Sequence, residues 1–286
     1  MKSVCIKLTN QKTVKYLLEE LDNFEIENIY FSCKKFKIYY NVIIHYKGKN
    51  LNLFLKSLAE MLSFTIIDLY EENIIKNLIK SEYFYFEPYE RQKIANITSE
   101  DLYELEEAVY PPKKRFKIIY QILYDYLNSN RSIILKGFIT FRIKAYFETL
   151  LEQIDKSVSK FIVEKEYAEF ISLLKIYVNS EKSTCKEVHL IYYNFKPILL
   201  DENKNIIKIE DDSLSSKYLS DITFSSNDYT LNTLLNLVPK KIHIHLIDEN
   251  IDEFINTLKL IFEERVDFCN DCEICKIYQK RPAIKT

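Results

Sequence analysis

Residues 241–275 read KIHIHLIDENIDEFINTLKLIFEERVDFCNDCEIC, and this stretch predicts a strand, a helix and a thiol cluster in succession. Apolar and polar side chains alternate over 241–246, which is typical of a β-strand. The next segment is apolar on one face at helical spacing, through Ile251, Phe254, Ile255, Leu258, Ile261 and Phe262. Asn250, with Glu253 three residues later, has the pattern of a capping box at the start of this helix. Cys269, Cys272 and Cys275 follow directly.

The three cysteines have the spacing of metal ligands. Thiolate is a soft ligand, and both Zn²⁺ and iron–sulfur clusters take several thiolates from one short segment. Steps of three residues bring the thiols together whether the segment is helical or turns at 270–271. A ferredoxin-type run needs a fourth cysteine at position 279, where Gln279 stands. The other cysteines, Cys5, Cys33 and Cys185, are remote in sequence, so the site is one ligand short.

Histidine is the other source of a fourth ligand. His243 and His245 are two residues apart and share one face of the predicted strand. A helix of about 15 residues runs back roughly the length of that strand, which places Cys269 near His243. The predicted metal ligands are therefore Cys269, Cys272, Cys275 and His243, although packing of the helix on Ile242 and Ile244 puts the histidines on the opposite face. Zinc is favoured, with an iron–sulfur cluster, an oxidation-sensitive thiol cluster without metal, or a disulfide within the trio as alternatives.

The remaining chain predicts an α+β fold. The N-terminal portion has the order β-α-β-β-α, 65–110 is helical but interrupted near Pro88, and 116–179 forms long helices. A hairpin is expected with arms at 188–192 and 206–209 and a turn near 201–204, then a loop over 210–228 and a helix ending at Pro239. Pro111-Pro112 indicates a boundary between an N-terminal region, 1–110, and a C-terminal region, 111–286, which could also pack as one domain.

The composition excludes several classes of function. The chain has 286 residues and only 2 glycines, so phosphate-binding loops, dinucleotide turns and the nucleophile elbow are excluded. The formal net charge of −2 argues against a nucleic-acid partner, and the basic run Lys113–Arg115 is interpreted as the start of a helix. No run is long enough to span a membrane, and no signal peptide is evident. Six irregularly spaced cysteines favour a cytoplasmic protein with reduced thiols.

Several segments resemble the YtxC-like sporulation proteins. They are FRIKAY at 141–146, EKEYAEFISLLKIYV at 164–178, VHLIYYNFKPILLDENKNII at 188–207, and the strand, helix and cysteine trio after Pro239. The resemblance covers about 137–275. It implies a protein of an endospore-forming bacterium, associated with sporulation, and it carries no catalytic residue over to this chain.

Two classes of function follow. The favoured one is a non-enzymatic, sporulation-associated interaction module, with unidentified protein partners and a C-terminal thiol or metal site. The alternative is a metal- or thiol-dependent enzyme that uses Cys269, Cys272 and Cys275, which would need a general base nearby.

Overall fold

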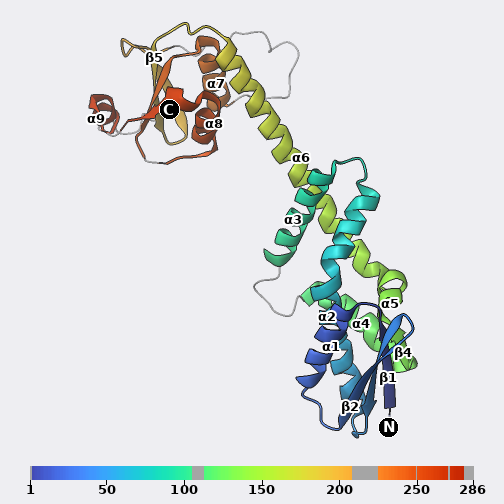
Figure 1. The fold of residues 1–286 in the computed structure, drawn as a ribbon. Coiled ribbons are helices and arrows are strands. Elements are labelled where there is room, and N and C mark those ends of the chain that lie inside the picture. The colour runs from blue at the N-terminus through green and yellow to red at the C-terminus, as the bar shows by residue number, and fades with distance from the viewer. Residues whose placement is uncertain (1, 105–112, 208–224, 249, 270, 280–286) are drawn as a thin grey trace. The chain divides into compact units, whose positions relative to one another are not determined.

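The computed structural model describes residues 2–104, 113–207, 225–248, 250–269 and 271–279. The chain divides into two compact units, Met1–Val163 (unit 1) and Glu164–Thr286 (unit 2), shown in Figure 1. The boundary between these two units lies after Val163 in the sequence, whereas the proline pair indicated a boundary near residue 110. Residue 110 does not separate two cores, because the helix Leu51–Glu82 packs against the helix Lys113–Ser129 within one core. Pro111 and Pro112 themselves lie outside the described residues.

Unit 1 begins with the predicted β-α-β-β-α order. Its elements are β1 (Lys2–Leu8), α1 (Gln11–Asp22), β2 (Ile29–Phe36), β3 (Tyr39–Tyr46), α2 (Leu51–Glu82), α3 (Pro88–Glu104), α4 (Lys113–Ser129), β4 (Ser132–Ile134), α5 (Leu135–Arg142) and the first part of α6 (Lys144–Ser180). The expected interruption near Pro88 is present, because Pro88 opens α3 after a short break. The strand β4 has three residues and was not predicted.

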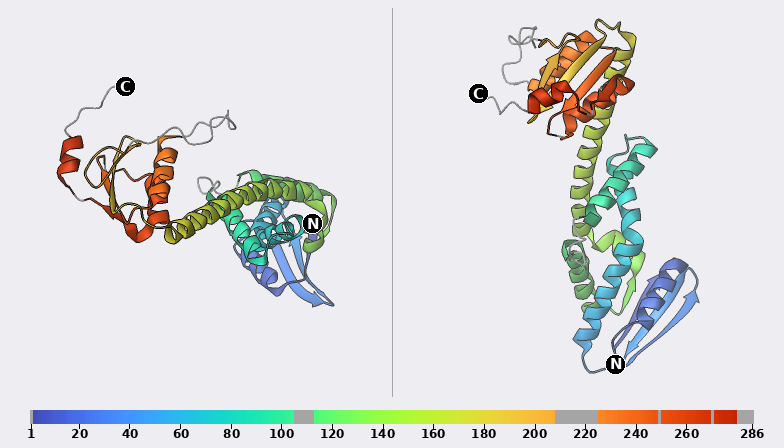
Figure 2. Two further views of the ribbon diagram at one scale, coloured as in Figure 1. Left: turned by 90° about the horizontal axis from the view of Figure 1, so that it is seen from above. Right: turned by 90° about the vertical axis from the view of Figure 1, so that its left-hand side faces the viewer.

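The sheet of unit 1 has the strand order β2-β3-β1-β4. The pairs β1–β3 and β2–β3 are antiparallel, and β4 joins β1 in parallel. One face carries the buried alternate residues of the two central strands, which are Val4, Ile6, Leu8, Val42, Ile44 and Tyr46. They pack in one cluster with apolar residues of α1 and α2, among them Leu17 and Phe54. The helices visible beside the N-terminal strands in Figure 2 supply this core.

A polar network lies in the helical part of unit 1. Glu71 of α2 accepts hydrogen bonds from Arg115 of α4 and from the hydroxyl of Tyr146 in α6. The side chains of Glu71 and Arg115 are only 13% and 8% exposed, so this ion pair is largely removed from water. Lys113–Arg115 opens α4 as the sequence indicated, but Arg115 is buried and bound within the unit.

Unit 2 contains the end of α6, then β5 (Glu187–Tyr193), β6 (Lys196–Leu200), α7 (Ser226–Leu237), β7 (Lys241–Leu246), α8 (Glu253–Phe262), the 3-10 turn η1 (Glu263–Arg265), β8 (Val266–Phe268) and α9 (Glu273–Gln279). Its sheet has the order β6-β5-β7-β8, with β5–β6 antiparallel and the other two pairs parallel. The fold is α+β, as predicted. None of the described helices combines the length and apolar character that a membrane crossing requires.

Two local predictions in unit 2 need correction. The hairpin turns at Asn194 and Phe195, both with positive φ, and not at 201–204. Positive φ is uncommon for phenylalanine, and two-residue hairpin turns usually contain glycine. Because this turn contains no glycine, no signal in the sequence predicted it. A second turn does lie at 201–204 and ends in an isolated bridge between Leu200 and Ile206, while most of the predicted 210–228 loop lies outside the described residues. The helix α8 is capped by Asp252, whose side chain accepts from the Ile255 amide, and not by Asn250.

Alternation along β5 and β7 gives the second sheet two different faces. Val188, Leu190, Ile242 and Ile244 point into a core formed with α7, α8 and the end of α6. The opposite face carries His189 of β5 and both His243 and His245 of β7. This histidine-bearing face is where α9 lies, since Ile274 clusters there with Ile191 and Leu200. The division places the histidines and the cysteine segment on the same side of the sheet.

Candidate metal centre

The edge strand β8 determines where the cysteines lie. It pairs with β7 in parallel, with Val266 opposite Ile242 and Phe268 opposite Ile244. The amide of Cys269 then donates to the carbonyl of Ile244 at 2.9 Å. The chain has therefore already travelled along β7 when it reaches the first cysteine, which lies at the level of His245.

The segment that follows Cys269 brings in the other two thiols. Asp271, between Cys269 and Cys272, has a φ of 118°, a backbone conformation that is uncommon for a residue other than glycine. The helix α9 begins at Glu273, and Cys275 lies in its first turn. Cys275 is buried, whereas Cys269 and Cys272 are half-buried and line a pocket of about 350 Å³. The pocket is also lined by His189, Lys204, His243 and Glu273.

Four side chains converge at this place. The Nδ1 atom of His245 lies 3.3 Å from the sulfur of Cys275 and 3.5 Å from that of Cys272. The Cys275 sulfur is 3.8 Å from that of Cys269 and 3.9 Å from that of Cys272. All four ligand atoms lie within 4.8 Å of one another. The group His245, Cys269, Cys272 and Cys275 could hold a metal ion, because three soft thiolates and one imidazole are a known donor set for several metals.

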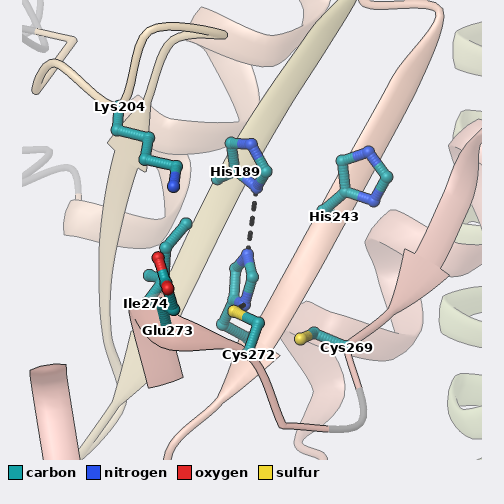
Figure 3. Close-up of a pocket in the computed structure, with 8 residues that line it drawn as sticks. His189, Lys204, His243, Cys269, Cys272, Glu273 and Ile274 are labelled. Atoms are coloured by element: carbon teal, nitrogen blue, oxygen red, sulfur yellow. Dashed lines mark hydrogen bonds between the residues drawn. The ribbon is translucent and has the colours of Figure 1, made fainter. Parts of the chain in front are cut away.

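A row of histidines extends from this group across the sheet. The Nε2 atom of His245 lies 3.1 Å from Nδ1 of His189, the contact drawn as a dashed line in Figure 3. The His189 ring stacks on that of His243 with centroids 5.1 Å apart, and His243 Nε2 lies 3.4 Å from a Glu187 carboxylate oxygen. Figure 3 shows His243 beside His189 and away from the sulfurs of Cys269 and Cys272. His245 thus turns one nitrogen to the thiols and the other to His189.

The environment favours a neutral His245 and lowers the pKa of Cys272, but it disfavours the thiolate of Cys275. Burial, together with the neighbouring His189 and His243, lowers the pKa of His245 to about 4, so this imidazole is neutral near pH 7. Burial raises the pKa of Cys272, but hydrogen bonds from the Cys275 and Ile274 amides and from Cys269 outweigh burial and lower it overall. Burial raises the pKa of Cys275. A metal ion here would displace a proton from Cys275, since the thiolate is the ligand.

The structure brings the three predicted cysteines together but not with His243. His245 takes the position that the sequence assigned to its neighbour two residues earlier. The prediction assumed that the helix alone returns the chain to the start of the strand. The unpredicted β8 carries the chain forward again by three residues, and Val266-Asp267-Phe268 is too short to give an alternation signal. The prediction therefore lacked β8, the edge strand that pairs with β7 in parallel.

The fold and the site define a class of protein: an α+β chain in two units with a Cys₃His group at the end of the second. In comparison with known families, residues 56–267 match the YtxC-like family. The match spans more than half of the chain, which therefore belongs to this family. It includes His245 and ends just before Cys269.

A curated relative supports the same assignment. The Bacillus subtilis (strain 168) protein described as uncharacterized protein YtxC is 21% identical over 203 residues, which cover 69% of this chain and 70% of the relative. No solved structure matches the chain. Neither description names a biochemical activity, so the function is argued from the site.

Proposed function

We propose that His245, Cys269, Cys272 and Cys275 bind a single Zn²⁺ ion in a structural site. The observation that carries the proposal is the convergence of the four ligand atoms within 4.8 Å of one another. Zinc in structural sites is almost always four-coordinate and tetrahedral, and Cys₃His is one of its standard ligand sets.

The distances between the ligand atoms support one ion. With Zn–S of about 2.3 Å and Zn–N of about 2.0 Å, a tetrahedron separates two sulfurs by about 3.8 Å and a sulfur from a nitrogen by about 3.5 Å. The sulfur pairs at 3.8 and 3.9 Å and the sulfur–nitrogen pairs at 3.3 and 3.5 Å agree with both values. An iron–sulfur cluster holds its thiolates farther apart, because several iron and sulfide atoms lie between them. This comparison favours zinc over the cluster.

A closed site of this kind has a structural role. Four protein ligands leave no coordination position for a substrate or an activated water, which a catalytic zinc needs. The metal would instead join β7 to the Cys269 segment and to α9. The helix α9 has seven residues, too few to be stable alone in water. The site therefore supports a non-enzymatic function, and the alternative of a metal- or thiol-dependent enzyme is less well supported.

The resemblance to sporulation proteins suggests where such a module acts. We place it in the cytoplasm of a spore-forming bacterium, where it would bind protein partners during sporulation. The zinc site would hold the C-terminal part of unit 2 in the shape that those partners recognise. This cellular role rests on the family resemblance, and the zinc site rests on geometry.

Deletion of the gene from its own bacterium is expected to lower the yield of spores and to leave vegetative growth unchanged. Complementation with the wild-type gene or with a Cys185→Ser variant should restore spore formation, because Cys185 lies outside the metal group. A Cys275→Ser variant should fail. Normal spore yield in the deletion strain, or a growth defect in cells that are not sporulating, would contradict the sporulation role.

His189 is expected to position His245 for the metal. Ligation through Nδ1 leaves the proton of His245 on Nε2, where it can be donated to His189 Nδ1, and loss of such a partner typically costs 10–100-fold in metal affinity. The His189→Ala variant should therefore bind Zn²⁺ about 10–100-fold more weakly, measured by competition with a chromophoric chelator. The His189→Asn variant, whose Oδ1 can accept the same hydrogen bond, should recover most of the affinity.

The control for this prediction is His243→Ala. This change removes the ring that stacks on His189 but leaves the hydrogen bond between His189 and His245 in place. Its effect on zinc affinity should be smaller than that of His189→Ala. Equal losses in the two variants, or no rescue by asparagine, would show that His189 does not position His245.

A further inference from the structure

The sheet of unit 1 has one face that the core does not use. The alternate side chains of β1–β4 that point away from the core are half-buried or exposed. They are Ser3, Cys5, Lys7, Tyr30, Ser32, Lys34, Phe36, Tyr39, Asn41, Ile43, His45, Ser132 and Ile134. We call this set the outer face. The apolar cluster of unit 1 forms on the other side of the sheet, so within the described residues 2–104 and 113–163 no helix packs its apolar face on the outer face.

The outer face is basic although the chain as a whole is not. The four strands β1–β4 contain no aspartate or glutamate. Residues 29–50 include no acidic residue either, and they contain Lys34, Lys35, Lys37, Lys47 and Lys49. Lys7 and Lys34 belong to the outer face itself, and they flank Asn41 in the sheet register. The net charge of −2, which argued against nucleic acid, is the sum of a basic sheet and acidic residues elsewhere.

Two aromatic rings stand exposed on this face. Tyr30 is 56% exposed and Phe36 is 64% exposed, at opposite ends of β2. They are six steps apart along the strand, which corresponds to about 20 Å. Lysine ammonium groups lie over both rings, with Lys47 at 4.7 Å from the Tyr30 centroid and Lys37 at 5.7 Å from that of Phe36. Each ring therefore has a cation beside it that could contact an anion bound next to the ring.

We propose that the outer face of the unit 1 sheet binds single-stranded nucleic acid. Unpaired bases would stack on Tyr30 and Phe36, and Lys7, Lys34 and Lys47 would contact the phosphates between them. Aromatic rings on an open sheet, with basic residues around them, are the standard means of binding single strands, because every base has a face that can stack. In a duplex the bases are already stacked, so the exposed rings would gain little from it.

The proposal does not depend on the zinc site, which lies in the other unit. The test uses the full-length protein and fluorescein-labelled oligouridine and oligothymidine of about 12 nucleotides, followed by fluorescence anisotropy. Both single strands should bind more tightly than a duplex of the same length, and the comparison of the two shows whether RNA or DNA is preferred. Raising the salt concentration from about 50 to 200 mM should weaken binding steeply, as expected for phosphate contacts.

Variants identify the surface. Tyr30→Ala combined with Phe36→Ala should weaken binding of the single strands at least about tenfold, because two stacking sites are lost. Phe84→Ala combined with Tyr85→Ala is the matched control, since those rings are also exposed in unit 1, at 71% and 64%, and lie outside the sheet. Lys34→Glu should weaken binding and reduce its salt dependence. The Cys275→Ser variant should bind the oligonucleotides as the wild type does, so that failure of the zinc proposal is distinguishable from failure of this one.

Three results would overturn the proposal. They are no binding of either single strand at the lower salt concentration, equal effects of the two aromatic double variants, and binding to anionic phospholipid vesicles without binding to oligonucleotides. The last would show that the basic outer face contacts a membrane surface.

Discussion

Replacement of Cys275 by serine is expected to weaken zinc binding by about two orders of magnitude or more. Structural zinc sites contribute about 10–16 kcal/mol of binding energy, so one ligand of four accounts for about 3 kcal/mol, which corresponds to more than a hundredfold in affinity. Cys275 should show the largest effect of the three cysteines, because it is buried and lies within 4 Å of His245, Cys269 and Cys272.

The same variant should loosen the end of unit 2. Without the metal, α9 is held to the sheet mainly by the small cluster around Ile274, and β8 has three residues. Amide hydrogen exchange over 266–279 should therefore become faster, while β5 and the first part of β7 stay protected. Cys185→Ser is the control, because this half-buried thiol belongs to unit 2 but not to the metal group. Unchanged zinc affinity in Cys275→Ser, or an equal loss in Cys185→Ser, would refute the assignment of the ligands.

Replacement of Glu71 by glutamine is expected to destabilise unit 1 by about 3–5 kcal/mol. Glutamine keeps the size of the side chain but removes the carboxylate charge that faces Arg115 and accepts from the Tyr146 hydroxyl. Removal of one partner of a buried ion pair typically costs this much, because the attraction between the two charges no longer offsets their burial. Urea unfolding followed by circular dichroism measures the change in the free energy of unfolding.

The neighbouring residue offers a matched control. Glu72 pairs with Lys76 at 2.5 Å one turn along α2, but its side chain is 73% exposed. Surface pairs of this kind contribute about 0.3–0.5 kcal/mol, so Glu72→Gln should leave the unfolding midpoint almost unchanged. Similar midpoints for Glu71→Gln and Glu72→Gln would show that the Glu71 network does not stabilise the unit.

Where local patterns determine the structure, the sequence predicted it. The alternation in β1, β3 and β7 and the helical spacing in α1, α6 and α8 predicted these elements, because each buries one face against a core. The two-residue turn at Asn194 and Phe195 was missed, since phenylalanine seldom adopts positive φ. The short strands β4 and β8 were also missed. Each is defined by pairing with a strand distant in sequence, and three residues show no periodicity.

The candidate site was predicted in part for the same reason. The spacing of Cys269, Cys272 and Cys275 is local, so the trio was evident. The choice between His243 and His245 depends on the register of β8 against β7, which is a long-range property. The outer face of unit 1 was overlooked for a different reason: the net charge of the chain averages a basic sheet with acidic segments elsewhere, and only the sheet topology places Lys7 and Lys34 on either side of Asn41.

The most direct test of the zinc site is elemental analysis of the full-length protein, purified without chelator and without oxygen. The proposal predicts about one zinc ion per chain and no iron, with zinc lost from a His245→Ala variant and retained in a His243→Ala variant. Protein that is free of metal, that contains iron with sulfide, or that loses zinc with His243→Ala but not with His245→Ala would contradict it.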